Sequence, residues 1–463
     1  MNNLLLMFVT VAVGVAVAAL DLSLYVAGAV VGTPAYVFLV RRPVLACAVL
    51  AVASNVTGTT WVSPSKISGV LLIPPLAYQA FRQKSTVASP PWFMLATVAL
   101  ALWLQVCDLF GIMSMSYDYL VTLIGALIIM TLMHQFIRNR ADLSVFVAAQ
   151  AATLALVAVT VPLFITTEEM EGMVRTGGLL GEPNSLANAV ARLLPFLLGI
   201  ATYQRMPRWA RLGAVLAVPA CMWALFGANS RSGTLAMIIA VLAFGGLVTR
   251  NARNRSIALV GAIGAAVIIN AVAPAAFHER TIDILISSAG MSEQQVDLVE
   301  ATSGRHLMNL VALDAIAQNP LVGLGSGGFV AYNWNSAYAG TRVHNAYLGL
   351  GAWGGLPALL FAALLHIYAI AVGWRTLVRS GPDRPLVAAC LAAGAGSVAS
   401  LFNSAQMLSL SEWTIFAMCS TLPNIFPEVA AAPSPTPDVP RPETRIAVPV
   451  APTAANLGTA STA

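Results

Sequence analysis

Charged side chains are scarce in this sequence. Only 9% of its 463 residues are Asp, Glu, Lys or Arg, whereas 58% are hydrophobic. Soluble globular domains usually carry roughly 25% charged residues. This shortage excludes an ordinary soluble domain and indicates a polytopic membrane protein.

Metal-binding patterns are also missing. Five cysteines lie in apolar segments without metal-like spacing, so we predict that they serve packing. They are Cys47, Cys107, Cys221, Cys390 and Cys419. The acidic residues show no spaced carboxylate pair of the kind that a glycosidase or a metal site needs. The sequence therefore predicts no metal and no cofactor.

Long apolar runs are abundant, and they recur from the first residues to about Phe426. A helix needs about 20 apolar residues to cross a ~30 Å hydrocarbon core, which predicts an all-α polytopic protein with about 12 to 14 transmembrane helices. We place them near 3–20, 22–40, 43–61, 67–81, 92–113, 117–136, 143–166, 185–203, 212–227, 233–249, 256–275, 345–373, 385–407 and 412–427. The first run lacks a preceding positive charge and a small-residue cleavage site, which favours a retained span.

The basic residues fall mostly in alternate short connections, as in cytoplasmic loops. This predicted inner side holds 17 of the 24 Lys and Arg residues: Arg41, Arg42, Arg82, Lys84, Arg138, Arg140, Arg205, Arg208, Arg211, Arg250, Arg253, Arg255, Arg375, Arg379, Arg384, Arg441 and Arg445. Six fall outside, namely Lys66, Arg175, Arg231, Arg280, Arg305 and Arg342, and Arg192 lies within a span. The net charge of +5 thus reflects membrane topology and does not indicate nucleic-acid binding.

These patterns predict five parts. They are N-terminal transmembrane helices at 1–164, transmembrane helices with outer-face arginine motifs at 165–275, a large outer loop at 276–343, C-terminal transmembrane helices at 344–427, and a cytoplasmic tail at 428–463. The tail is rich in Pro, Ala and Thr, so we expect it to be disordered.

The large outer loop shows signs of a folded lid of two or three short helices. Ser292 and Gln295 form a capping-box pattern. A second helix is predicted before Pro320, with helical spacing at Leu307, Leu310, Val311 and Leu313. Glycines 323, 325 and 328 then satisfy the G-x-G-x-x-G pattern, but without a βαβ context we expect no dinucleotide there.

His344 is the most informative of five histidines, because it stands where the outer loop ends and a predicted span begins. A neutral imidazole at a water–membrane boundary accepts a proton from a hydroxyl group. Asn345 beside it could fix a neighbouring group by hydrogen bonding. The alternative for any single histidine is a structural role.

Outer-face arginines are the second unusual feature, because the positive-inside rule disfavours them. Arg175, Arg231, Arg305 and Arg342 each offer a rigid fork of donors that suits phosphate oxygens. The alternative for Arg231, in "NSRSG", is a snorkelling arginine at a helix end. Arg192 inside a span is either functional or part of an internal ion pair.

The outer acidic cluster gives a weaker signal, and Glu182, near Asn184, is its most interesting member. Together, the arginines and one histidine at the membrane boundary suit a diphosphate at the lipid headgroup level and a hydroxyl nucleophile.

At this point the sequence resembles the O-antigen ligase and polymerase superfamily of bacterial membrane glycosyltransferases. The similarity lies, in order, in "RTGGLLGEPNSLAN" (175–188), "NSRSGTLAMIIA" (229–240), "GRHLMNLVALDAIAQNPLVGLGSGGF" (304–329) and "HNAYLGLGAWGGLPALL" (344–360). The family pattern usually has Asn-Pro-Asn where this chain has Glu182-Pro183-Asn184, which leaves the role of position 182 open.

The resemblance implies metal-independent, inverting transfer of a glycan from undecaprenyl diphosphate to a sugar hydroxyl, on the periplasmic side of the bacterial inner membrane. His344 would activate the acceptor, and Arg231 and Arg305, with Arg175, would bind the diphosphate. Further candidates are Arg192, Arg342, Glu182, Asn184 and Asn345.

The acceptor distinguishes two enzymes that share donor and mechanism. An O-antigen ligase uses lipid A-core, and an O-antigen or exopolysaccharide polymerase uses a lipid-linked glycan; we favour the ligase. The alternative from another class is a transporter or flippase of a lipid-linked substrate, which would place ionisable residues along a path near mid-membrane.

Overall fold

The computed structural model of the chain describes residues 36–54, 64–82, 92–111, 116–162, 167–170, 173–180, 182–249, 305–333, 343–402 and 409–427. The predicted spans at 3–20 and 256–275, the capping box at Ser292 and the tail at 428–463 lie outside these residues.

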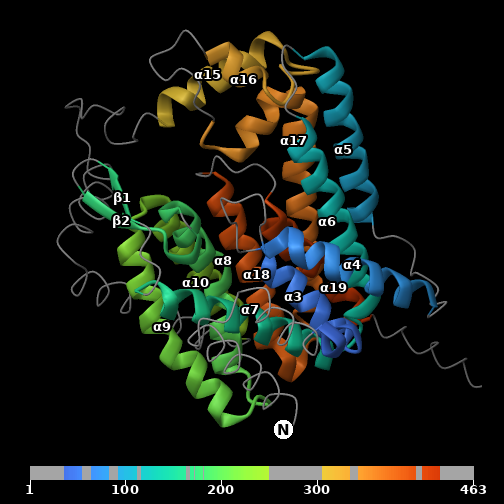
Figure 1. Cartoon of the computed structure of the whole chain (residues 1–463), viewed down its shortest axis with the longest axis vertical. Helices are drawn as coiled ribbons and strands as arrows, with labels where there is room; N and C mark the ends of the chain where they lie inside the picture. Colours follow the sequence, from blue (N-terminus) through green and yellow to red (C-terminus); the bar gives the residue numbers. More distant parts are fainter. Residues whose placement is uncertain are drawn as a thin grey trace, which may run out of the picture. The chain divides into compact units, whose positions relative to one another are not determined.

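Helices dominate the described residues, and a small antiparallel β-hairpin joins two of them (Figure 1). The elements are α3 (Pro43–Ala53), α4 (Pro64–Arg82), α5 (Trp92–Phe110), α6 (Ser116–Phe136), α7 (Arg140–Thr160), β1 (Thr167–Met170), β2 (Met173–Thr176), α8 (Pro183–Thr202), α9 (Arg208–Ala228), α10 (Arg231–Val248), α15 (Arg305–Gln318), α16 (Gly328–Tyr332), α17 (Ala346–Thr376), α18 (Arg384–Leu401) and α19 (Leu410–Ile425). The predicted all-α class is confirmed. The sequence did not predict the hairpin.

Seven helices in the described part of the chain are long and apolar enough to cross a membrane. They are α5, α7, α8, α9, α10, α17 and α18, the last counted from Gly381. The chain is therefore a multi-pass membrane protein, and the total of about 12 to 14 spans remains a prediction. All five cysteines are buried and unbridged, in agreement with their predicted packing role.

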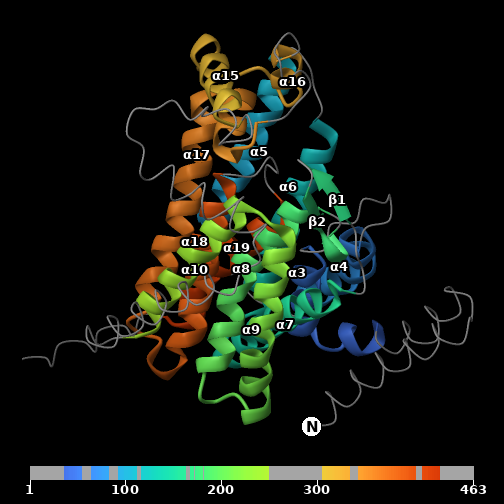
Figure 2. The ribbon, with the colours of Figure 1, turned by 90° about the vertical axis from the view of Figure 1, so that its left-hand side faces the viewer.

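Small residues let α8, α10 and α18 pack closely, and Figure 2 shows these three helices side by side. A Cβ atom on Gly233 would lie 2.3 Å from the Cβ of Ala187. A Cβ on Gly396 would lie 2.9 Å from both the carbonyl oxygen of Ala191 and the Cβ of Ala240. In a bilayer, where apolar surface gives little driving force between helices, such close backbone approach supplies the packing energy.

Asp383, which is fully buried, joins three connections at one end of the bundle, here called the basic end. It accepts hydrogen bonds from Tyr203 (2.7 Å) and Arg205 (3.2 Å), and Arg140 lies 3.3 Å from its other oxygen. Burial, followed by the bond to Asp383, raises the pKa of the Tyr203 hydroxyl. The connections α6–α7, α8–α9 and α17–α18 thus lie at one end, as their positive charge predicted.

Helix α17 is a hairpin of two helical arms. Gly354 (φ −121°, ψ 19°) and Gly355 (φ 72°, ψ −174°) are not helical. The hydroxyl of Tyr347 lies 2.9 Å from Nδ1 of His366, whereas 19 residues of straight helix would separate them by about 28 Å. The predicted span near 345–373 therefore falls on α17, but it is not one continuous helix. Residues 346–353 form a short arm that packs back against the long arm, 356–376.

The reversal depends on local backbone chemistry. Gly355 occupies the left-handed region, and a Cβ there would lie 2.3 Å from the carbonyl oxygen of Leu321. Pro357 then occupies the second position of the long arm, where a missing N–H is harmless. Continuous hydrophobicity concealed this break from the span prediction.

The lid helices α15 and α16 lie over the end of α5 and the turn of α17, at the top of Figure 1. The glycine-rich turn between them binds the end of the short arm: the N–H of Leu324 donates to Ala352 (2.8 Å) and that of Gly325 to Trp353 (3.0 Å). Two carbonyls of the arm are thereby satisfied. The glycine-rich turn thus packs the lid against the short arm.

One side of α15 is buried against the short arm and the glycine-rich turn. The predicted helix before Pro320 is confirmed, but Leu310 and Leu313 are each 49% exposed. The residues buried against the short arm and the glycine turn are Met308, Ala312, Ala315 and Ile316. Helical spacing thus predicted the helix, and tertiary contacts decided which of its sides is buried.

Asp108, near the end of α5, binds the lid to the short arm of α17. It accepts from the backbone N–H (2.6 Å) and the hydroxyl (3.2 Å) of Ser326, and from the indole N–H of Trp353 (2.9 Å). In the lid itself, Tyr332 donates to Asp314, and this bond raises the pKa of Tyr332.

Candidate functional site

Arg175 lies in β2 and joins the β-hairpin to the end of α9 and the start of α8, opposite the basic end. Its side chain is buried; Nε donates to the carbonyl of Ala228 (3.0 Å) and Nη2 to Oδ1 of Asn184 (3.0 Å). The hydroxyl of Ser230 donates to the same Asn184 oxygen (2.9 Å). Arg175 and Asn184, both predicted site residues, are thus adjacent to the start of α10.

Arg231 is the first residue of α10. Asn229 ends α9 in the left-handed conformation (φ 43°, ψ 53°), and Ser230 caps α10 by accepting from the N–H of Gly233 (3.4 Å). The tight turn is the whole connection, as predicted. Arg231 is half-buried and stands at a helix N-terminus, where backbone N–H groups and the helix dipole attract anions.

Glu182 precedes α8, where Pro183 occupies the first helical turn. Its carboxylate is exposed and accepts a hydrogen bond from Ser185 (2.9 Å) one turn further on. It therefore lies at the same end as Arg175.

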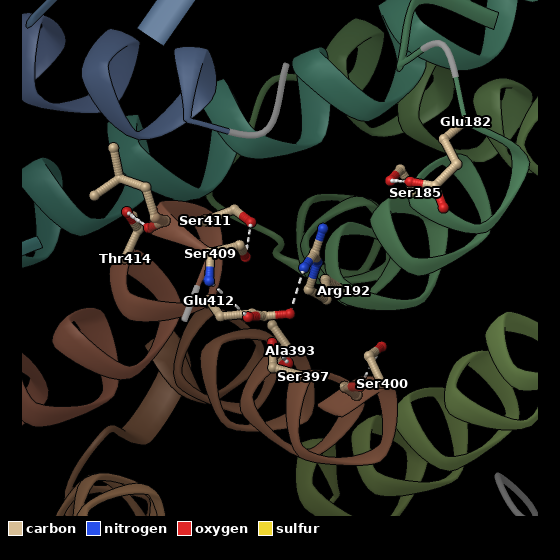
Figure 3. A network of polar contacts seen from close by, with 12 residues as sticks. Glu182, Ser185, Arg192, Ala393, Ser397, Ser400, Ser409, Ser411, Glu412 and Thr414 are labelled. Atoms are coloured by element: carbon tan, nitrogen blue, oxygen red, sulfur yellow. Dashed lines mark hydrogen bonds and ion pairs between the residues drawn. The ribbon is translucent and has the colours of Figure 1, made fainter. Parts of the chain in front are cut away.

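Arg192 forms an internal ion pair, one of its two predicted roles. Its Nη1 lies 2.8 Å from Oε1 of Glu412 in α19, and both side chains are buried (Figure 3). Glu412 was not among the predicted site residues, because it lies 220 positions away and its only sequence signal is a lone acid in an apolar segment.

His344 lies directly before the short arm and is half-buried. Asn345 is the N-cap of that arm: its side-chain oxygen accepts from the N–H groups of Tyr347 and Leu348, both at 3.1 Å. The side chain of Asn345 therefore binds the backbone of the short arm, and its predicted hydrogen bonding serves to cap this arm.

The start of the short arm lies beside the long arm and near one end of α18. Tyr347 lies beside His366, which is 11 residues into the long arm, about 16 Å from the turn and about 15 Å from the arm's end at Thr376. The ring of Tyr347 also lies 5.0 Å from that of Phe402, which directly follows the last residue of α18. The place of His344 at the outer boundary stays a prediction.

The remaining predicted arginines belong to the lid. Arg305 is the first residue of α15, and Arg342 lies outside the described residues. The described residues contain no group of three His, Cys, Asp or Glu side chains that could hold a metal ion.

An apolar groove of about 770 Å³ runs between α10, α17 and α18. At one end is Phe402, whose ring lies 5.0 Å from that of Tyr347, and Arg375 is at the other, towards the basic end. The groove therefore extends from beside the short arm towards the basic end.

A multi-pass helical bundle with a lid, buried polar networks and an arginine at a helix N-terminus opposite the basic end defines a helical membrane protein. Residues 212–363 match the family described as O-antigen ligase, so the chain carries a domain of the O-antigen ligase and polymerase superfamily, as its resemblance predicted. The match includes Arg231, Arg305 and His344, whereas Arg175 and Arg192 precede it. No curated protein matches the chain.

Proposed function

We propose that the chain moves a glycan from undecaprenyl diphosphate to a sugar hydroxyl at the periplasmic face of the bacterial inner membrane, and that the acceptor is lipid A-core. The observation that carries this proposal is the family match, which unites Arg231, Arg305 and His344 in one domain. The basic end faces the cytoplasm by the positive-inside rule.

The arginines stabilise the leaving group. As the bond between the sugar and the diphosphate breaks, negative charge grows on the diphosphate oxygens, and pre-placed donors stabilise it without reorganisation. Arg231 projects from the N-terminus of α10, beside the Arg175–Asn184–Ser230 network that fixes this helix end. Arg305 contributes from the start of the lid helix α15.

His344 removes the acceptor proton. The acceptor oxygen attacks the anomeric carbon while its proton passes to the imidazole, and the diphosphate leaves from the opposite face of the sugar with the bonding electrons. This displacement inverts the anomeric centre and needs no metal, because guanidinium groups balance the charge.

The apolar groove holds the polyprenyl chain of the donor. Its lining is almost entirely apolar, and its Phe402 end contacts Tyr347 of the short arm. A chain lying there would place its diphosphate towards the ends of α8 and α10.

The five-part organisation at 1–164, 165–275, 276–343, 344–427 and 428–463 fits this proposal, with the site drawn from the second, third and fourth parts.

The alternative function is a transporter or flippase of a lipid-linked substrate. The one observation that favours it is the buried Arg192–Glu412 pair, because ion pairs inside a membrane bundle also line substrate paths.

Purified protein tests the proposal with an undecaprenyl-diphosphate glycan as donor, offered both lipid A-core and a second lipid-linked repeat, in wild type and His344→Ala. Product on lipid A-core that disappears in the variant supports the ligase. Growth of the lipid-linked chain supports the polymerase instead. Folded protein that forms neither product but moves donor across a vesicle membrane would support the transporter.

A further inference from the structure

The Arg192–Glu412 ion pair lies near the middle of the bundle. Arg192 follows Pro183, the start of α8, by nine residues, or about 14 Å, and precedes Thr202, its end, by about 15 Å. The two side chains are only 5% and 3% exposed, and their nearest atoms are 2.8 Å apart.

Stability alone does not account for this pair. Two charges that leave water lose solvation that their mutual attraction often fails to recover, and an apolar pair of similar volume is often as stable or more stable. Nε of Arg192 and Oδ1 of Asn188, one turn away on the same helix, are also buried, and neither has a hydrogen-bond partner among the residues that the structure describes. Buried polar atoms of this kind add a further penalty.

The pair fixes the start of α19. Glu412 accepts from the backbone N–H of Ser409 (3.2 Å) as well as from Arg192, so the same carboxylate completes the capping box of this helix (Figure 3). The position of the first turn of α19 relative to α8 therefore depends on Glu412.

The first turns of α19 in turn hold the short arm. His366 stacks on Phe416 with ring centroids 4.0 Å apart and meets the edge of Trp413 at 5.7 Å. Nδ1 of the same histidine lies 2.9 Å from the Tyr347 hydroxyl, in the first turn of the arm. A continuous set of contacts thus leads from Arg192 to the residue three positions after His344.

The other end of α8 belongs to the proposed diphosphate site. Asn184, eight residues before Arg192 and about 12 Å from it along the helix, binds both Arg175 and Ser230. Helix α8 therefore contacts the proposed diphosphate site through Asn184 and, through Arg192 and Glu412, the helix that holds the short arm.

We propose that Arg192 and Glu412 are positioning residues that hold the short arm, and with it His344, in register with the arginine site at the ends of α8 and α10. This inference rests on the proposed glycan transfer. Neither residue touches the reacting atoms, so loss of the pair slows the transfer step and leaves donor affinity unchanged.

The test replaces both charges by apolar side chains of similar size, in Arg192→Met/Glu412→Leu. We expect a melting temperature equal to or above that of wild type, unchanged donor KM, and kcat lowered by about tenfold or more. A double variant that is stable and keeps wild-type kcat would overturn the proposal, because the pair would then be purely structural.

Tyr203→Phe is the matched control. It removes a buried hydrogen bond of similar length, to Asp383 at the basic end. We expect a lower melting temperature with wild-type kcat. An equal fall in kcat would show that any loss of buried polar contacts slows the enzyme, and the proposal would fail.

A second measurement is independent of catalysis. Cysteine introduced by His344→Cys reports the position of the arm through its rate of reaction with a maleimide, against a low background because the native cysteines are buried. We expect the rate to change by about threefold or more when Arg192→Met/Glu412→Leu is added, since exposure controls thiol access. An unchanged rate overturns the proposal, whereas wild-type protein that transfers no glycan overturns only the proposed function.

Discussion

The hydroxyl of Tyr347 and Nδ1 of His366 lie 2.9 Å apart, although both belong to one apolar segment and are 19 positions apart in the chain. This contact shows that the segment folds back on itself at Gly354 and Gly355. The first turn of the short arm consequently lies beside the long arm and beside Phe402 at the end of α18, and His344 directly precedes that turn.

Gly355→Ala is expected to disrupt the hairpin. The new Cβ would meet the carbonyl oxygen of Leu321 at 2.3 Å, and φ is 72°. Strain and overpacking together should lower the free energy of unfolding by about 2 kcal/mol or more, and transfer activity should fall with it. Thermal unfolding in detergent measures this. Gly213→Ala, with open space around its Cβ in α9, should match or slightly exceed wild-type stability.

Arg231→Lys is expected to weaken donor binding and turnover by about tenfold or more, because a point charge does not reproduce the fork of the guanidinium. Donor KM and kcat are the measurements, with Arg208→Lys as the control, since Arg208 is exposed near the basic end. Wild-type kinetics for Arg231→Lys would instead identify Arg231 as a snorkelling residue.

His344→Ala should abolish transfer while donor affinity stays within about twofold of wild type, because a general base acts on the acceptor and contributes to the transition state alone. Donor affinity is measured by titration with labelled lipid-linked glycan. Retained turnover would remove His344 as the base, and a parallel loss of binding would place it in the donor site.

Asp108→Ala should loosen the lid. The backbone N–H of Ser326 and the indole of Trp353 lose their acceptor, which costs about 1–3 kcal/mol of local stability for buried donors. Hydrogen exchange across 323–328 should therefore accelerate. Asp142→Ala, which removes an exposed capping box from α7, serves as the control and should leave exchange in the lid unchanged.

Ala399→Trp should fill the groove and weaken binding of a donor with a full undecaprenyl chain, since Ala399 lines it. A donor with a short prenyl chain should bind both proteins equally, because its chain does not extend along the groove. Leu242→Trp, on an exposed face of α10 outside the lining, is the control. Equal loss for both donors would show a general structural effect.

Local patterns in the sequence determined the membrane class, the approximate places of the described spans, and several features of the site. The pattern Asn-Ser-Arg-Ser-Gly predicted a tight connection that leaves Arg231 at a helix end, and Pro320 marked the end of the lid helix. These features depend on neighbours within a few residues, through propensity, capping and hydrophobic periodicity.

Tertiary structure alone decided which distant residues meet. Glu412 pairs with Arg192 across 220 positions, and Asp108 binds the lid across 218. Both acids stand singly in apolar segments, where periodicity gives no indication of a partner. The reversal at Gly355 was equally hidden, because both arms are apolar and hydropathy is insensitive to chain direction. Long-range packing supplies the information that fixes these contacts, and the place of the short arm beside the long arm follows from it.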